Sequence, residues 1–178
     1  MGLSDTLPKR LAVPSTERRL VREQSGPMTV HESWAIVCAD VKKLDESARL
    51  TFVTSGLSID QIGRSRTWEF MFVVPRLRAD APVTLSPADD AEDVDSAPIY
   101  MTLRLTAAPE SALGHASLPA SFRDSPEVVA ELAAQGVDFV AGPTDLKLES
   151  RLLPSGEAVW VTYYWDAEMT VPFSNRAS

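Results

Sequence analysis

The stretch TVHESWAIVCADVKKL, residues 29–44, decides the fold of this chain because it carries both a helix start and an apolar helix face. Thr29 and Glu32 have the spacing of a capping box, in which each side chain accepts a hydrogen bond from a backbone N–H of the first turn. The apolar residues recur at helical spacing: Val30, Trp34, Val37, Cys38, Val41 and Leu44. We therefore expect a helix whose apolar face packs against a sheet.

Three alternating segments follow this helix along the chain. They cover residues 48–55, 67–74 and 99–107. Alternation of apolar with polar or small residues has the two-residue period of a β-strand with one buried face. In the third segment, Tyr100 and Arg104 fall on the more polar face. The first half of the chain thus predicts a helix followed by three antiparallel strands.

A second helix is predicted to begin at Ser125-Pro126, with the serine as N-cap and the proline at the first helical position. Gly136 stands where a left-handed cap would end that helix. Three further strands are expected after it, over residues 146–152, 158–165 and 169–173. The order helix, strand, strand, strand therefore occurs twice.

This repeated order predicts one α+β domain over residues 28–178, made of two tandem halves whose helices pack on an antiparallel sheet. The first half covers residues 28–108 and the second covers residues 120–175. The residue identities of the halves barely match, so the repeat is inferred from the order of the elements.

Two segments lie outside the repeated pattern. Residues 1–27 have no sustained periodicity and are expected to form an irregular N-terminal arm, in which residues 17–24 could form a short basic helical turn. Residues 76–98 contain several prolines and carboxylates and are expected to form an acidic loop. Its centre, residues 89–95, lacks the glycine and the final glutamate of an EF-hand loop, which favours a solvated loop over a calcium site.

Composition limits the classes of partner. The chain has 25 acidic and 17 basic residues and a formal net charge of −8, so its overall field repels nucleic-acid phosphates and anionic membranes. Its longest apolar runs fall well short of the roughly 20 residues that a spanning helix needs. Basic residues near the N-terminus are not followed by the apolar stretch of a secretory signal. We expect a cytoplasmic protein that binds neither nucleic acid nor membrane.

The residue types of catalytic and metal sites occur here without the spacing that such chemistry needs. Cys38 lies on the apolar stripe of the first helix, which favours a buried thiol over a nucleophile. His31 and His115 are expected to be solvated surface residues, and Asp60 and Arg64 flank a glycine as a loop ion pair or a partner contact. No nucleophile elbow, phosphate loop or metal motif accompanies them. The sequence therefore predicts no catalytic residue, no cofactor and no metal ligand.

Residues 158–165, AVWVTYYW, depart from ordinary patterning because both faces of this predicted strand are apolar. We expect one set to face the helices: Val159, Val161, Tyr163 and Trp165. The opposite face would then expose Trp160 and Tyr164, beside Tyr100 and Arg104 of a neighbouring strand. An aromatic patch with a basic residue is typical of a protein-binding surface. The alternative is that the N-terminal arm or the acidic loop covers these rings.

Parts of both halves resemble the PepSY-like proteins and, more broadly, cystatin-like tandem α-β-β-β modules. The resemblance lies in ARLTFVTS at 48–55, in GRSRTWEF at 63–70, and in the helix from Pro126 followed by the strand with Trp160. It covers about residues 29–174. The resemblance implies a non-enzymatic interaction or inhibitory module and brings no catalytic residues.

Three hypotheses for function follow. The first is a non-enzymatic binding or regulatory module that recognises a protein or peptide through an open sheet face, anchored by Trp160 and Tyr164. The second is an acidic secretion-type chaperone or immunity protein that acts as a homodimer and masks a basic partner. The third is a small-molecule-binding or hydrolytic cup between the sheet and the helices.

Overall fold

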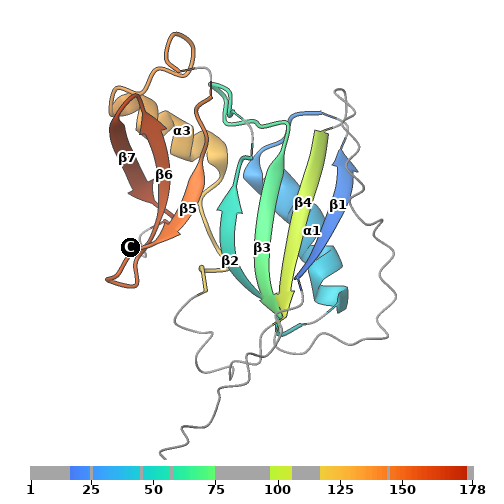
Figure 1. The fold of residues 1–178 in the computed structure, drawn as a ribbon. Helices are drawn as coiled ribbons and strands as arrows, with labels where there is room; N and C mark the ends of the chain where they lie inside the picture. The colour runs from blue at the N-terminus through green and yellow to red at the C-terminus, as the bar shows by residue number, and fades with distance from the viewer. Residues whose placement is uncertain are drawn as a thin grey trace, which may run out of the picture.

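The computed structural model describes residues 17–24, 26–44, 46–56, 58–74, 97–105, 117–143 and 145–175 (Figure 1). Within these ranges, the side chains of residues 17–24, 44, 74 and 97–105 are not described. The acidic loop, apart from its last two residues, and His115 lie outside the described residues. Predictions about them therefore stay predictions.

The protein is an α+β fold with one mixed sheet. Its elements in chain order are β1 (Glu17–Gln24), α1 (Val30–Leu44), β2 (Arg49–Thr54), β3 (Trp68–Val74), β4 (Ala97–Leu105), α3 (Ser125–Ala134), β5 (Glu149–Leu152), β6 (Ala158–Tyr164) and β7 (Ala167–Pro172). The strand order is β1-β4-β3-β2-β5-β6-β7. Figure 1 views the sheet from the side away from the helices, with α1 behind one part and α3 behind the other. None of the described helices is long and apolar enough to cross a membrane.

Two predictions about the sheet are wrong. The segment Glu17–Gln24, expected to be irregular or a helical turn, is the strand β1 and pairs antiparallel with β4. Its own sequence alternates weakly, but the strongly alternating β4 offers it a ladder of backbone partners, and strand formation depends on such context. In addition, β3 and β4 run parallel, so the sheet is not antiparallel throughout.

The start of α1 confirms the predicted capping box. The Thr29 N–H donates to Glu32 Oε2 at 2.8 Å, and the Glu32 N–H donates to Thr29 Oγ1 at 3.3 Å. These bonds satisfy two backbone donors that have no partner within the helix. Local sequence therefore fixes where α1 begins.

The start of α3 differs from the prediction by one residue. Its N-cap is Asp124, whose side chain accepts from the Ser125 N–H, while Ser125 is already helical. The Ser125 hydroxyl instead bridges distant segments, because it donates to the Gly63 carbonyl at 2.6 Å and accepts from the Val30 N–H at 2.9 Å. The serine thus joins α3 to the loop before β3 and to α1.

Asp124 caps both helices. Its Oδ1 accepts from the Ser125 N–H at 2.9 Å and from the His31 N–H, in the first turn of α1, at 3.0 Å. Both helix N-termini carry partial positive charge, which a carboxylate stabilises. His31, predicted as a solvated residue, is half-exposed, and its Nε2 also lies 2.7 Å from the Phe122 carbonyl oxygen. We call Gly63, Asp124, Ser125 and the first turn of α1 the helix junction.

Candidate binding surface on the β6–β7 hairpin

Trp160, predicted as the exposed anchor of a partner-binding patch, is buried. It is 0% exposed and belongs to the hydrophobic core. Its ring centroid lies 4.8 Å from that of Phe173 and 6.2 Å from that of Phe122. The predicted assignment of the two faces of β6 is therefore wrong for Trp160, which points to the helix side of the sheet.

The strand order separates the other members of the predicted patch. Tyr164 is only partly buried and packs against the core. Tyr100 and Arg104 belong to β4, whose neighbours are β1 and β3, and three strands lie between β4 and β6. The four residues thus do not form one surface. The prediction fails because a sequence shows which residues alternate but not which strands become neighbours.

Two other aromatic residues of this region are exposed. Tyr163 is 50% exposed and Trp165 is 67% exposed. Trp165 follows the last residue of β6 and, with Asp166, forms the two-residue connection to β7, because Tyr164 pairs with Ala167. The ring centroids of Tyr164 and Trp165 are 6.1 Å apart. The exposed aromatic residues of this region therefore lie near the tip of the β6–β7 hairpin, and not in the middle of β6 as predicted.

Trp165 has an unusual backbone conformation. Its φ is 54°, and it is the one residue other than glycine with positive φ in the described part of the chain. The left-handed region crowds Cβ against the backbone and is an outlier for a bulky residue. Such strain persists where the surrounding structure imposes it, and it concentrates at functional sites.

A row of polar groups crosses the hairpin on the sheet face away from the helices. Arg151 of β5 donates through Nη1 to Glu168 Oε2 of β7 at 2.8 Å and through Nη2 to the Tyr163 hydroxyl of β6. The hydrogen bond from Arg151 lowers the pKa of the Glu168 carboxyl, and its bond to Glu168 raises the pKa of Arg151. Both side chains are about two-fifths exposed. Glu168 is therefore ionised at neutral pH and faces solvent.

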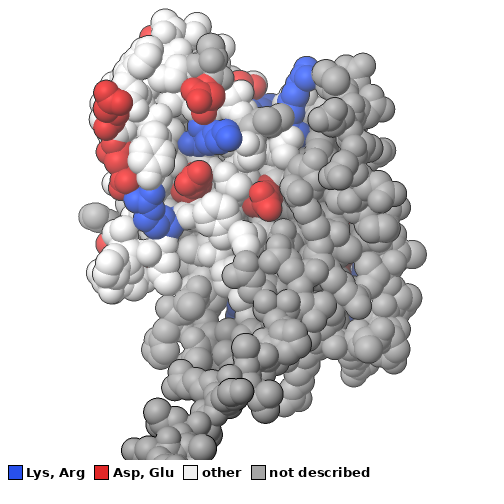
Figure 2. All heavy atoms as spheres, in the orientation of Figure 1, with Lys and Arg blue, Asp and Glu red and all other residues white. Residues whose placement is uncertain are grey.

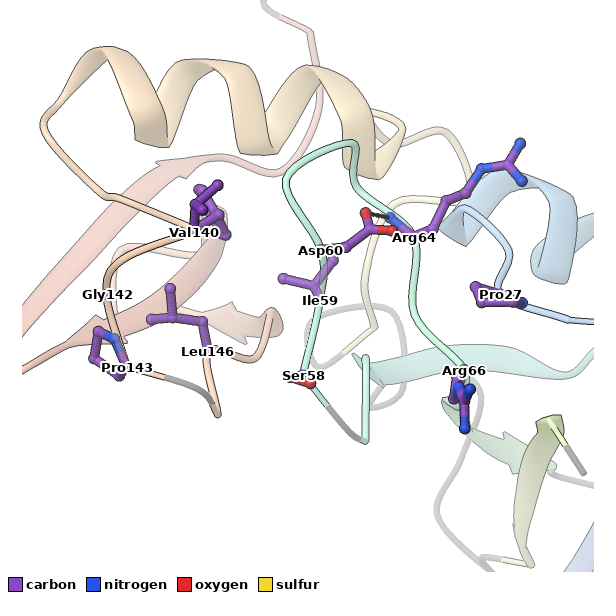
Figure 3. Close-up of a pocket in the computed structure, with 11 residues that line it drawn as sticks. Pro27, Ser58, Ile59, Asp60, Arg64, Arg66, Val140, Gly142, Pro143 and Leu146 are labelled. Atoms are coloured by element: carbon purple, nitrogen blue, oxygen red, sulfur yellow. Dashed lines mark hydrogen bonds between the residues drawn. The ribbon is translucent and has the colours of Figure 1, made fainter. Parts of the chain in front are cut away.

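A pocket of about 420 Å³ lies between two loops, residues 58–66 and residues 139–146. Figure 3 shows the Asp60 side chain turned toward the Arg64 backbone of its own loop, and the side chain of Arg64 directed toward α1, where Arg64 Nη2 lies 3.6 Å from Glu32 Oε1. The Asp60 carboxylate accepts from the Arg64 and Ile62 N–H groups and shapes its own loop. The charged groups therefore do not converge on the pocket, and the predicted loop ion pair between Asp60 and Arg64 is instead a side-chain to backbone bond.

The reactive side chains of the described residues differ in part from the predictions. Cys38, predicted to be buried, is partly exposed. No group of three or more His, Cys, Asp or Glu side chains within the described residues could hold a metal ion. In the space between helices and sheet, where the cup was expected, aromatic rings pack on one another. The exposed aromatic residues of the β6–β7 hairpin therefore form the candidate site within the described residues.

Comparisons with known proteins assign no family. No protein-family model matches the chain, and no curated protein or solved structure matches it closely enough to count as a relative.

Proposed function

We propose that this protein is a non-enzymatic binding module that recognises a protein or peptide through the sheet face and tip of its β6–β7 hairpin. The observation that carries the proposal is Trp165, which is exposed and held in left-handed backbone. Glycine is the usual residue for that conformation. A tryptophan there costs stability and buries little, which favours a role for its ring in contact with another molecule.

The surroundings of Trp165 support this proposal. Binding hot spots in protein interfaces are enriched in tryptophan, tyrosine and arginine. Tyr163 lies on the hairpin, Arg151 lies on the adjacent strand β5, and the two side chains are hydrogen-bonded. The Arg151 guanidinium carbon lies 5.9 Å from the Tyr163 ring centroid. These contacts hold the two side chains in place before any partner arrives, which reduces the entropy lost on binding.

The test compares the wild-type chain with Trp165→Gly and with Ile62→Ala. Ile62 is a second exposed hydrophobic residue, 58% exposed, on a loop away from the hairpin, and serves as the matched control. We expect proteins captured by the immobilised wild-type chain to be lost with Trp165→Gly and kept with Ile62→Ala. Because the ring is largely exposed, thermal unfolding of Trp165→Gly should not begin at a lower temperature. Equal capture by all three chains would remove the proposal.

We also propose that the two tandem halves are structural repeats that meet at the centre of the sheet. In the sheet, the strands of the two halves run in the order β4-β3-β2 and then β5-β6-β7. The first strands of the halves, β2 and β5, are therefore neighbours, and the third strands, β4 and β7, lie farthest from the boundary between the halves. The pairing of β2 with β5 at Thr54 and Glu149 joins the halves. They differ because β3 and β4 run parallel whereas β6 and β7 form a hairpin. We include in this proposal that both halves are related to PepSY-like modules.

A further inference from the structure

The edge of the sheet at β7 has backbone groups that point away from the sheet. β7 stands last in the strand order and pairs with β6. The Phe173 N–H donates to the Ala158 carbonyl at 3.1 Å, so this opposed pair is a hydrogen-bonded one. Such pairs alternate along an antiparallel ladder. The N–H and C=O groups of Glu168 and Thr170 therefore face outward, together with the C=O of Pro172.

Within the described part of the chain, this edge is exposed to solvent and is bonded by one side chain. Ala167, Glu168 and Thr170 are exposed. The Thr170 carbonyl accepts from Gln135 Nε2 of α3, at the long distance of 3.5 Å. Exposed edges are commonly protected by bulges, proline or a covering element, and here Pro172 limits pairing at one end. A short extended segment can pair along Glu168 to Thr170.

The side chains around this edge define the charge of a matching segment. On the outer face, Arg151 of β5 is hydrogen-bonded to Tyr163 of β6 and to Glu168 of β7. Glu168 is the member of this group on the edge strand, so a basic residue is its complementary neighbour in an added strand. Figure 2 shows acidic side chains along the margin of the molecule at β7, with side chains of both signs nearer the middle. The whole chain carries a net charge of −8, which speeds the approach of a cationic partner.

We propose that the hairpin binds an extended segment of a partner protein that adds as a strand to the edge of β7 and places a lysine or arginine beside Glu168. This inference rests on the proposed binding role. Backbone hydrogen bonds to Glu168 and Thr170 would supply affinity, and the basic side chain would supply specificity, as in other strand-addition complexes. The tip of the hairpin would pack an apolar residue of the same segment on Trp165.

A display library of random peptides of about ten residues, which is long enough for one strand, tests this on the full chain. We expect the enriched peptides to share a lysine or arginine at one fixed position, beside Glu168. Thr170→Pro removes an outward N–H, breaks no bond to β6, and is expected to weaken binding about tenfold. Glu168→Gln should weaken binding by a smaller factor and reduce its salt dependence.

N-methylation of the peptide gives a test that leaves the protein unchanged. Methylation of a residue whose N–H faces β7 should weaken binding about tenfold, whereas methylation of the adjacent residue should leave affinity within about twofold. The proposal is overturned if no peptide is enriched, if enriched peptides lack basic residues, or if both methylated peptides bind alike. If Trp165→Gly abolishes capture of partner proteins but Thr170→Pro does not, strand addition is wrong and the proposed function still holds. A dimer that Thr170→Pro dissociates would show that a second copy occupies the edge instead.

Discussion

Gly63 and Trp165 both have left-handed backbone, with φ of 79° and 54°, but in opposite surroundings. Gly63 is buried at the helix junction, where a Cβ would lie 2.4 Å from the Pro126 nitrogen. Trp165 is exposed at the tip of the β6–β7 hairpin. At Gly63 close packing leaves no room for a side chain. Trp165 carries a large side chain although glycine would suit its backbone conformation better. The contrast separates a position that folding fixes from one at which the fold does not require the residue present.

The largest expected effect is that of Gly63→Ala. Left-handed strain and the clash with the backbone of Pro126 should together destabilise the fold by about 4 kcal/mol. Gly156→Ala is the matched control, because Gly156 also has positive φ but a Cβ there meets nothing within 4 Å, so about 1 kcal/mol is expected. Urea denaturation measures both. Equal losses would contradict the close packing of the helix junction.

Asp124→Ala should have the next largest effect, because one carboxylate oxygen caps both helices. Loss of two caps is expected to lower the free energy of unfolding by about 2 kcal/mol. Asp124→Asn keeps an acceptor oxygen and loses only the charge, so it should cost about 0.5 kcal/mol. Chemical denaturation of the two variants checks the order. Similar losses would show that charge, not hydrogen bonding, dominates the junction.

Trp165→Gly should act in the opposite direction. Relief of the left-handed strain is expected to stabilise the protein by about 1 kcal/mol relative to Trp165→Ala, which keeps a Cβ in the same conformation. Differential scanning calorimetry of the two variants measures the difference. A lower unfolding temperature for the glycine variant than for the alanine variant would mean that the hairpin tip is not strained, and the comparison with Gly63 would fail.

The smallest expected effect concerns the ion pair between Arg151 and Glu168. Arg151 lowers the pKa of Glu168 in the folded state, so the pair stabilises the fold fully above the unfolded-state pKa. That contribution is lost as the pH falls through the lower folded-state pKa. Arg151→Met should raise the pKa of Glu168 in an NMR titration and leave the unfolding temperature near neutral pH almost unchanged, since the pair is exposed. An unchanged pKa would show that the pair does not form in solution.

Helices and strands were largely predictable because their signals are local. The capping box at Thr29 fixed the start of α1, and alternation located β3 close to its observed bounds. The run of apolar and aromatic residues at 158–165 located β6. The prediction shifted the start of α3 because Ser125 and Asp124 are both good N-caps, and the choice depended on contacts with Gly63 and Val30. β1 was missed because its partner, β4, lies far along the chain.

The candidate site was predictable only as a region. The apolar residues of 158–165 indicated β6 as an unusual strand. Because both of its faces are apolar, its sequence does not show which face meets the helices, and Val159, Val161 and Trp160 are all buried. Trp165 was assigned to the strand, although the turn residue Asp166 beside it could have signalled that the strand ends earlier. The strain at Trp165 has no sequence signal of its own.

The sequence by itself determined the α+β class, the order of most elements and the acidic charge, because periodicity, caps and composition act over a few residues or over the whole chain. Only the tertiary structure decided the strand order, the parallel pairing of β3 with β4 and the choice of which rings are buried. Those features depend on contacts between residues far apart in the chain, such as Ser125 with Gly63 and Trp160 with Phe122. Local pattern selects the elements, and long-range packing selects which side chains and strand edges stay exposed.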